Sequence, residues 1–234
     1  MNQQKKVIRF IPSLDVTNLS QAKKIVQDVA GLDCVYGYKV GFSLGLSHGL
    51  PLVVKAIRSI SDKPIIYDHQ KGATDIPDTG SLFAETLAFA GIDEAILFPQ
   101  AGPRTLRAWI AALKERGIKV IVGGIMTHDS YLVSEGGYLS DERIPEIFTT
   151  AASDGVNAFV IPLTKPEAAE RLTRALPAPN TAEFYSPGFG QQGGDPAMFP
   201  FARTHYLIVG RSLLKAKDPA AWLQEQSHAL EILK

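Results

Sequence analysis

The stretch "DHQKGATDIPDTG", residues 68–80, places three ionisable side chains close together directly after the apolar run "KPIIY". Asp68, Lys71 and Asp75 fall within eight positions. Because isolated buried charges are costly, such a cluster indicates either a solvated turn or a site that uses the charges. Carboxylates on both sides of a lysine keep its ammonium group charged in a partly dry pocket, so that it can donate a proton.

A carboxylate that faces an anionic group of a substrate repels that group. The repulsion helps only if the substrate group loses its charge or departs during the reaction. A repelling carboxylate combined with a protonated lysine therefore favours proton transfer to a carbanion. Whether these side chains can meet depends on the elements that carry them.

Short apolar runs alternate with amphipathic helical patterns along the chain. The runs are continuous rather than alternating, which is typical of parallel strands covered on both faces. Expected strands cover residues 7–15, 34–40, 64–68, 94–98, 119–124, 158–162, 182–186 and 205–210. Expected helices cover residues 19–30, 50–60, 80–90, 103–116, 144–154, 165–175 and 219–233, with a short helix or none before the last strand. This order predicts an α/β fold, a (β/α)8 TIM barrel in a single domain over residues 1–234.

Helix-start signals support this division. Thr164 and Asp218 are the expected N-caps of the last two helices, with Pro166 and Pro219 in their first turns. An open doubly wound sheet is the alternative fold. It normally carries a glycine-rich turn after the first strand, and "SLDVTNLS" lacks one.

Charged residues occur at the ends of the first three expected strands. Asp15 ends the first strand, Lys39 the second and Asp68 the third, with Lys71 just beyond. In (β/α)8 barrels the carboxyl ends of the strands form the mouth where the chemistry takes place. A single charge there is equally well explained as a solvated loop residue, but four at consecutive strand ends indicate a site.

The last two strands are followed by a candidate phosphate site. "SPGFGQQGGDP", residues 186–196, is a glycine-rich loop after the seventh strand, and "VGRS", residues 209–212, follows the eighth. Loops at these two places commonly bind phosphate through backbone N–H groups. Arg211 adds a forked cation that suits a phosphate group.

Composition narrows the classes of partner. Twenty-four basic residues balance twenty-four acidic ones, so no net field favours nucleic acid or an anionic membrane. No segment approaches the roughly 18 apolar residues that span a membrane, and none follows the basic start as in a signal peptide. We therefore expect a cytoplasmic protein that binds neither nucleic acid nor a membrane. The single cysteine, Cys34, excludes an internal disulfide.

Taken together, the motifs "YKVG", "DHQKGATDIPDTG", "SPGFGQQGGDP" and "IVGRSLLKAKDPA" resemble those of orotidine 5′-monophosphate decarboxylases. The resemblance runs in order from Asp15 to Pro219, and its last two motifs are the most specific. That family consists of dimeric (β/α)8 barrels that convert orotidine 5′-monophosphate to UMP without a metal or an organic cofactor. The resemblance therefore implies no cofactor, no metal site, and a homodimer.

The resemblance also implies catalytic roles. Lys39 would join the charge network and contact the ribose, while Asp68 would lie against the departing carboxylate. Lys71 would protonate C6 of the pyrimidine after carbon dioxide leaves. Asp75 would reach into the active site of the neighbouring subunit.

Further residues would bind the substrate. Asp15 would bind the ribose hydroxyls, and Thr127 stands where the family has a serine that touches the pyrimidine. The loop around residues 186–198 would close as a lid over the phosphate. Ile76 and Thr79 would accompany Asp75 to the active site of the neighbouring subunit. Gln192, Gly210 and Arg211 would hold the phosphate. The full set of implied binding residues is Asp15, Ile76, Thr79, Thr127, Gln192, Gly210 and Arg211.

One departure concerns the proton donor. The family pattern is Asp-x-Lys-x-x-Asp-Ile, whereas two extra residues separate Asp68 from Asp75 here. Counting from either end puts Gln70 or Gly72 at the lysine position, and neither can donate the proton. We therefore assign Lys71 and expect the turn to bulge so that it is brought in.

Two other functions remain open. Related barrels include metal-dependent sugar-phosphate decarboxylases and aldolases, whose second strand ends in an acidic metal ligand. Lys39 stands there instead and would repel Mg²⁺. The second alternative function is that of a non-catalytic nucleotide-binding barrel that retains the phosphate site. Such a protein would bind UMP without turnover.

Remaining residues carry weaker signals. The single histidines His48, His128, His205 and His228 are interpreted as surface or packing residues, and His69 as a support for the bulge. The segment 131–146 is expected to be a long loop that either packs over the pyrimidine end or is an insertion.

Overall fold

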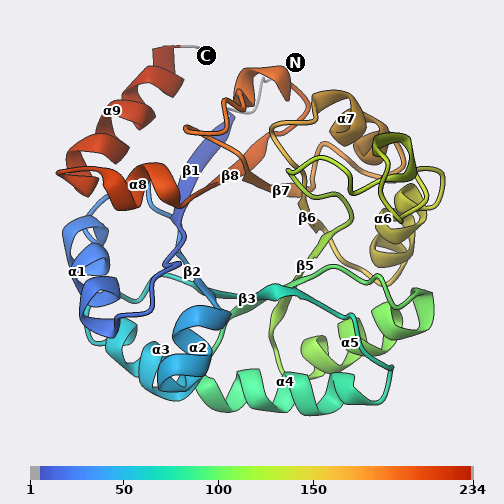
Figure 1. Ribbon diagram of the computed structural model, residues 1–234, viewed down its shortest axis with the longest axis horizontal. Coiled ribbons are helices and arrows are strands. Elements are labelled where there is room, and N and C mark those ends of the chain that lie inside the picture. Colours follow the sequence, from blue (N-terminus) through green and yellow to red (C-terminus); the bar gives the residue numbers. More distant parts are fainter. Residues whose placement is uncertain (1–5, 233–234) are drawn as a thin grey trace.

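The computed structural model describes residues 6–232, and within them every side chain except those of residues 70, 71, 231 and 232. Strands and helices alternate, and Figure 1 shows the helices as a ring around the strands. The strands are β1 Val7–Pro12, β2 Tyr38–Gly41, β3 Ile65–Gly72, β4 Glu94–Leu97, β5 Lys119–Gly123, β6 Ala158–Val160, β7 Glu183–Pro187 and β8 Thr204–Val209. The α-helices are α1 Leu19–Val29, α2 Phe42–His48, α3 Leu50–Arg58, α4 Thr79–Ala90, α5 Pro103–Glu115, α6 Ile144–Ser153, α7 Pro166–Arg174, α8 Arg211–Lys215 and α9 Pro219–Ile232.

All paired strands of the sheet are parallel, in the order β1-β8-β7-β6-β5-β4-β3-β2. The seam between β1 and β2 is joined by isolated bridges, Phe10 with Val35 and Ser13 with Lys39. The Leu14 amide donates to the Lys39 carbonyl across it at 2.8 Å. The sheet is therefore a nearly closed barrel, which confirms the predicted α/β TIM-barrel fold. One domain over residues 1–234 remains our interpretation.

Every expected strand and helix is present, with shifted ends, and residue 233 of the last expected helix lies outside the described residues. The second strand begins at Tyr38 rather than at residue 34, and β3 continues to Gly72. Helices α2 and α8 were not expected, and the connection between β7 and β8 contains the three-residue 3₁₀ helix η2, Pro196–Met198.

The two N-cap expectations had different outcomes. The Asp218 carboxylate accepts from the Ala221 amide at 2.9 Å, as expected of an N-cap. Thr164 as an N-cap is wrong, because Lys165 takes that position in α7. The Thr164 hydroxyl instead donates to the Thr127 carbonyl at 3.2 Å.

Apolar side chains fill the barrel interior as well as the layer between strands and helices. The interior cluster contains Ile11, Ile66, Ile96, Phe98, Ile121, Ala158, Val160, Tyr185 and Tyr206. Gly123 is required there, since a Cβ on it would lie 2.4 Å from the Phe98 ring. The Phe98 ring can therefore pack across β5 and form part of the barrel lining.

A polar network lies at the amino ends of the strands. Lys119, at the start of β5, donates to Glu183 Oε2 at 2.7 Å and to the Tyr185 hydroxyl at 2.9 Å. Glu94, at the start of β4, accepts from the hydroxyls of Tyr36 and Tyr185. Burial raises the pKa of Glu94. This end of the barrel is closed by mutually satisfied polar groups, which suits a stabilising role.

His205 is fully buried on the outer face of β8. One ring nitrogen, Nε2, lies 2.7 Å from the Ser186 hydroxyl of β7, and the ring packs edge-on against Phe199. Burial lowers the pKa of His205 to about 3. The structure therefore confirms a packing role for His205.

His205 predicts an acid-dependent stability. Because its folded pKa of about 3 lies below its ordinary value of about 6.5, the unfolded chain takes up a proton in that window and the folded chain does not. Between pH 6.5 and 4 the free energy of unfolding of the wild type should fall by up to about 1.4 kcal/mol per pH unit from this residue. Urea denaturation of wild type and His205→Gln across this range measures it. An equal slope in the variant would contradict the assignment.

Candidate active site at the carboxyl ends of the strands

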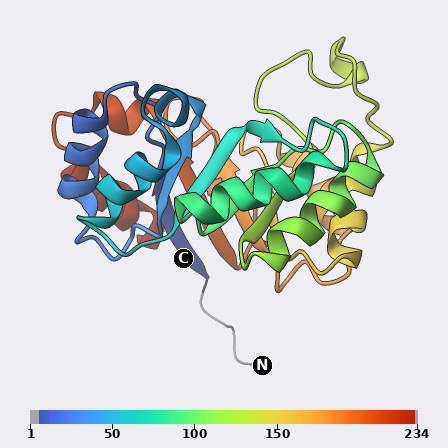
Figure 2. The ribbon, with the colours of Figure 1, turned by 90° about the horizontal axis from the view of Figure 1, so that it is seen from below.

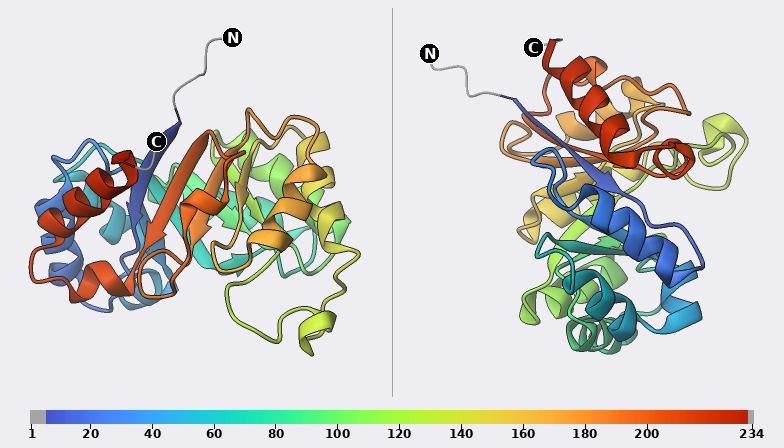
Figure 3. Two further views of the ribbon diagram at one scale, coloured as in Figure 1. Left: turned by 90° about the horizontal axis from the view of Figure 1, so that it is seen from above. Right: turned by 90° about the vertical axis from the view of Figure 1, so that its left-hand side faces the viewer.

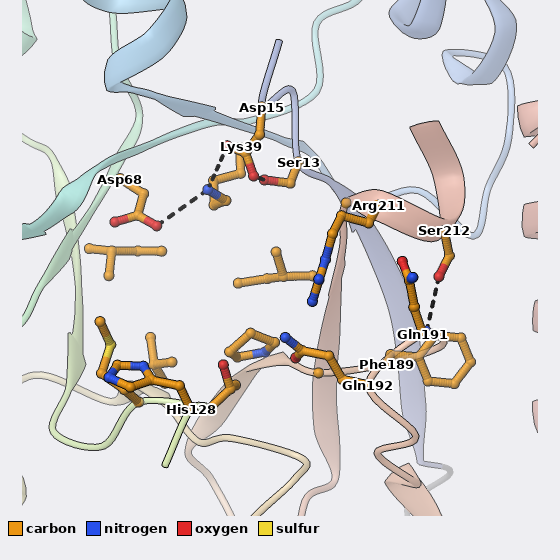
Figure 4. Close-up of a pocket in the computed structure, with 18 of the residues that line it drawn as sticks. Ser13, Asp15, Lys39, Asp68, His128, Phe189, Gln191, Gln192, Arg211 and Ser212 are labelled. Carbon is orange, nitrogen blue, oxygen red and sulfur yellow. Dashed lines mark hydrogen bonds and ion pairs between the residues drawn. The ribbon is translucent and has the colours of Figure 1, made fainter. Parts of the chain in front are cut away.

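A pocket of about 360 Å³ opens at the carboxyl ends of the strands (Figure 4). It is lined by Ser13, Asp15, Lys39, Asp68, Ile96, Phe98, Ile125, Met126, Thr127, His128, Val160, Pro187, Gly188, Phe189, Gln191, Gln192, Ile208, Gly210, Arg211 and Ser212. The expected residues among them are Asp15, Lys39, Asp68, Thr127, Gln192, Gly210 and Arg211. The barrel thus brings together side chains nearly 200 positions apart in sequence.

The charged end of the pocket is built around Lys39. Its ammonium group lies 3.2 Å from Asp15 Oδ1 and 3.3 Å from Asp68 Oδ2. Lys39 and Asp68 are only 5% and 4% exposed, so this pair is largely shielded from water. Burial alone would lower the pKa of Lys39, but the carboxylates of Asp68 and Asp15 outweigh it and raise the pKa. Lys39 therefore stays a cation held by two carboxylates.

Strand pairing explains why these three groups meet. Asp68 follows directly after the buried Tyr67 on β3, and β2 and β3 pair with Gly41 opposite Asp68. Lys39 itself bridges to Ser13, two residues before Asp15. The three charged side chains are consequently carried by three adjacent strands. Asp15 follows β1, whereas Lys39 and Asp68 lie within β2 and β3 rather than at the strand ends expected from the sequence.

The opposite side of the pocket is formed by the glycine-rich loop and the start of α8. Gln192 and Arg211 extend into the cavity in Figure 4. The Gln191 amide donates to the Ser212 hydroxyl at 3.0 Å, which ties the loop to the helix. Gly190 has a φ of +79°, and a Cβ there would lie 2.7 Å from Ser212 Oγ. Only glycine allows this close approach.

An apolar surface with two polar residues lies between these ends. The apolar lining is contributed by Ile96, Phe98, Ile125, Met126, Val160, Pro187 and Ile208. Thr127 and His128, which follow β5, add polar groups at the same place. His128 was interpreted as a surface or packing residue, and the structure shows that it lines the pocket. Its position after a strand end was the signal that could have identified it.

The long loop after β5 stands out from the carboxyl-end face, away from the start of β1 (Figures 2 and 3). It contains the 3₁₀ helix η1, Val133–Glu135. Lys165 donates to the His128 carbonyl at 2.9 Å and forms an ion pair with Glu135. Glu135 in turn accepts from the Tyr131 amide at 3.1 Å, and the hydrogen bond from Lys165 lowers the pKa of Glu135. Lys165 thus connects the loop after β6 to the segment that carries His128.

Asp75, Ile76 and Thr79 lie outside this pocket. Asp75 and Ile76 belong to the exposed loop between β3 and α4, where Ile76 is 58% exposed, and Thr79 begins α4. Trp109 and Thr105 of α5 hold the loop by donating to the carbonyls of Ile76 and Asp75, at 3.1 Å and 2.9 Å. Their expected role requires a second subunit and stays a prediction.

The expected bulge is present in β3. Tyr67 pairs with Ala95 and Gly72 with Leu97, so five steps along β3 match two along β4. The backbone of Lys71 lies within this bulge, while its side chain lies outside the described residues. His69 is on the same segment, with its ring nitrogen against the Tyr67 hydroxyl. The insertion is therefore absorbed between the regular pairs that end at Tyr67 and the single pair of Gly72 with Leu97.

The described part of the chain contains neither a cluster of metal-ligating side chains nor a membrane-spanning helix. No group of three or more His, Cys, Asp or Glu side chains in residues 6–232 is placed to hold a metal ion. Within the same range, every helix is too short or too polar to cross a membrane.

The family model described as "Orotidine 5′-phosphate decarboxylase / HUMPS family" matches residues 9–225. This chain belongs to that family. The orotidine 5′-phosphate decarboxylase of Methanosarcina barkeri is 34% identical over 212 residues, covering 90% of this chain and 89% of the relative. That of Methanosarcina mazei is 32% identical over 210 residues, with 90% and 89% covered.

Solved structures of orotidine 5′-phosphate decarboxylases are similar over nearly the whole chain. The enzyme from Methanocaldococcus jannaschii, complexed with the inhibitor BMP, superimposes with a TM-score of 0.80 at 27% identity, covering 97% of this chain and 98% of that one. The Pyrococcus horikoshii enzyme gives 0.75 at 26% identity, with 92% and 96% covered. The family suggested by the sequence motifs is thus confirmed.

The Lys165 contacts predict how the loop after β5 is held. Lys165→Met removes the ion pair to Glu135 and the bond to the His128 carbonyl. Amide hydrogens of residues 127–135 should then exchange about tenfold faster, because local opening loses these bonds. Hydrogen exchange with mass spectrometry measures this.

Arg174→Met is the matched control, because it breaks an exposed ion pair with Glu170 on α7. It should leave exchange in residues 127–135 unchanged. Equal exchange in Lys165→Met and wild type would show that Lys165 does not hold the loop.

Proposed function

We propose that this protein decarboxylates orotidine 5′-monophosphate to UMP, a step of pyrimidine biosynthesis. Membership of the family and the names of its curated relatives support this activity. The observation that carries it in this chain is the buried Lys39 ammonium between the carboxylates of Asp15 and Asp68. This cluster faces a pocket whose other side is the glycine-rich loop with Arg211.

The pocket has a suitable group for each part of such a nucleotide. Arg211, Gln192 and the Gly210 amide would hold the phosphate, since a forked cation and backbone N–H groups suit its oxygens. The apolar surface and Thr127 would contact the pyrimidine. Asp15 and Lys39, at the charged end of the pocket, would contact the ribose hydroxyls.

The charges suggest how the carbon–carbon bond breaks. Asp68 would lie against the substrate carboxylate, and their repulsion would be relieved as carbon dioxide departs. The electron pair of the broken bond would remain on C6. The Lys71 ammonium would then give its proton to C6, and Lys71 would regain a proton from solvent. The bulge in β3 supports this role for Lys71, because it accommodates the extra residues that surround it.

A reaction without a metal is part of the proposal. Where a metal-dependent relative would need an acidic ligand, Lys39 supplies a cation that already neutralises the nearby carboxylates. A divalent cation at this position would be repelled. Lys39 therefore supports the metal-free decarboxylase over the sugar-phosphate enzymes.

A homodimer is the second part of the proposal. Asp75 and Ile76 are on an exposed loop that hydrogen bonds from α5 hold in place, and Thr79 begins the adjacent α4. All three lie outside the pocket of their own chain. Leu82 and Phe89, on the adjacent α4, are 65% and 82% exposed. Exposed apolar groups beside this loop suit burial by a second copy. A cytoplasmic location and the absence of nucleic-acid and membrane partners stay predictions.

The first experiment follows the loss of orotate absorbance when protein is mixed with orotidine 5′-monophosphate in EDTA. Wild type should turn over, because no step needs a metal. Lys71→Ala should lower kcat by about 100- to 10,000-fold, the usual contribution of a general acid, while UMP still binds. Lys24→Ala, which removes an exposed lysine of α1, is the matched control and should behave as wild type.

Three outcomes would contradict the proposal. Wild-type turnover by Lys71→Ala would show that another group donates the proton. Activity that EDTA abolishes and Mg²⁺ restores would favour the metal-dependent alternative. UMP binding without any turnover by wild type would favour the non-catalytic barrel.

The shared site can be tested by mixing two inactive variants. In a mixed dimer of Lys71→Ala and Asp75→Asn, one of the two sites would combine an intact Lys71 with the partner copy's intact Asp75. Random reassembly of equal amounts should therefore restore about a quarter of the wild-type activity, since half of the dimers are mixed. Activity that stays at the average of the two variants would show that each site is made by one chain.

A further inference from the structure

Ser13 lies in the seam that closes the barrel. Its amide donates to the Val209 carbonyl of β8 at 2.8 Å, and its backbone bridges to Lys39 of β2. The residue is only 2% exposed, although it lines the pocket. Its backbone is therefore fixed from both sides, and its side chain has a defined place beside the charged groups.

The Ser13 hydroxyl donates to Asp15 Oδ2 at 2.7 Å (Figure 4). The other carboxylate oxygen of Asp15, Oδ1, accepts from the Lys39 ammonium at 3.2 Å. A carboxylate has about four acceptor directions, so two remain for other donors. The side chain of Asp15 is 45% exposed, which leaves those directions accessible from the cavity.

A half-exposed aspartate carboxylate that is held by one hydrogen-bond donor can rotate about χ2, because this torsion has no sharp minima. A second anchor on the other oxygen removes this freedom. A hydrogen bond to a charged acceptor is also stronger than one between neutral groups. The short bond from Ser13 therefore sets the plane of the Asp15 carboxylate, while Lys39 sets its direction.

We propose that Ser13 is a positioning residue, whose hydroxyl holds the Asp15 carboxylate in the orientation that binds the ribose hydroxyls of the substrate. The inference rests on the proposed function, because it takes the ligand of Asp15 to be a ribonucleotide. It assigns a role to a buried serine that does not touch the reacting atoms. Ser13 acts through Asp15 alone.

Binding of a matched ligand pair separates this role from a general structural one. UMP carries both ribose hydroxyls, and 2′,3′-dideoxy-UMP carries neither. Ser13→Ala should weaken UMP binding about tenfold and leave binding of the dideoxy compound unchanged, because only UMP uses the Asp15 carboxylate. Isothermal titration calorimetry gives both dissociation constants. The value of kcat/KM for orotidine 5′-monophosphate should fall by a similar factor.

Further variants check the hydroxyl itself. Ser13→Thr keeps the donor and should restore the preference for UMP, whereas Ser13→Cys keeps the size but donates weakly and should resemble alanine. In an Asp15→Ala background, Ser13→Ala should have no additional effect on UMP binding, because the residue acts through the carboxylate.

Two results would overturn the inference. Equal weakening of UMP and dideoxy-UMP by Ser13→Ala would indicate a general structural role, and an additive effect with Asp15→Ala would show independent action. The test also separates the two proposals. Absence of turnover by wild type would reject the decarboxylase activity, while the ratio of the two dissociation constants would still decide the role of Ser13.

Discussion

The ammonium of Lys39 between the carboxylates of Asp15 and Asp68 is the interaction on which the mouth of the barrel depends. Burial would remove the proton from an isolated lysine, and the buried carboxylate of Asp68 and the half-exposed carboxylate of Asp15 would repel each other without a cation. The buried charges of Lys39 and Asp68 are tolerated because they face each other. Asp15 follows β1 and Lys39 lies on β2, so their ion pair also crosses the seam where the described strands are joined only by isolated bridges.

The two ends of the barrel use similar groups in different ways. At the amino ends, Glu94, Lys119 and Glu183 are satisfied by one another and by tyrosine hydroxyls. At the carboxyl ends, Asp15 keeps acceptor directions that face the cavity. A polar network that is complete stabilises the fold, whereas one that is incomplete on the cavity side can bind a ligand.

Much of this organisation could be predicted from sequence because it depends on local pattern. Continuous apolar runs identified the strands, and charged residues at their ends identified Asp15, Lys39 and Asp68. The short α2 and α8 were missed because each has only one or two turns, too few for a periodic pattern. Ser13 and His128 were missed for a different reason, since their importance arises from contacts across the barrel. Ser13 could have been suspected, because a residue two positions before Asp15 in an extended segment lies on the same face.

The place of Lys71 shows the limit of motif counting. The family spacing pointed to glutamine or glycine, and only a physical requirement for a proton donor selected the lysine. The bulge on which that choice depended is a property of strand pairing and could be expected only in outline. The register of the bulge, with pairs at Tyr67 and Gly72, could be determined only from the structure.

That bulge also bears on how such a barrel can change over evolutionary time. Because pairing resumes in parallel register beyond it, added residues alter the segment that carries Lys71 without displacing β4 or its neighbours. Insertions here are therefore uncoupled from the geometry of barrel closure, unlike insertions within the paired part of a strand. A lineage can lengthen or shorten this one segment and so sample new placements of a reactive side chain on an unchanged scaffold.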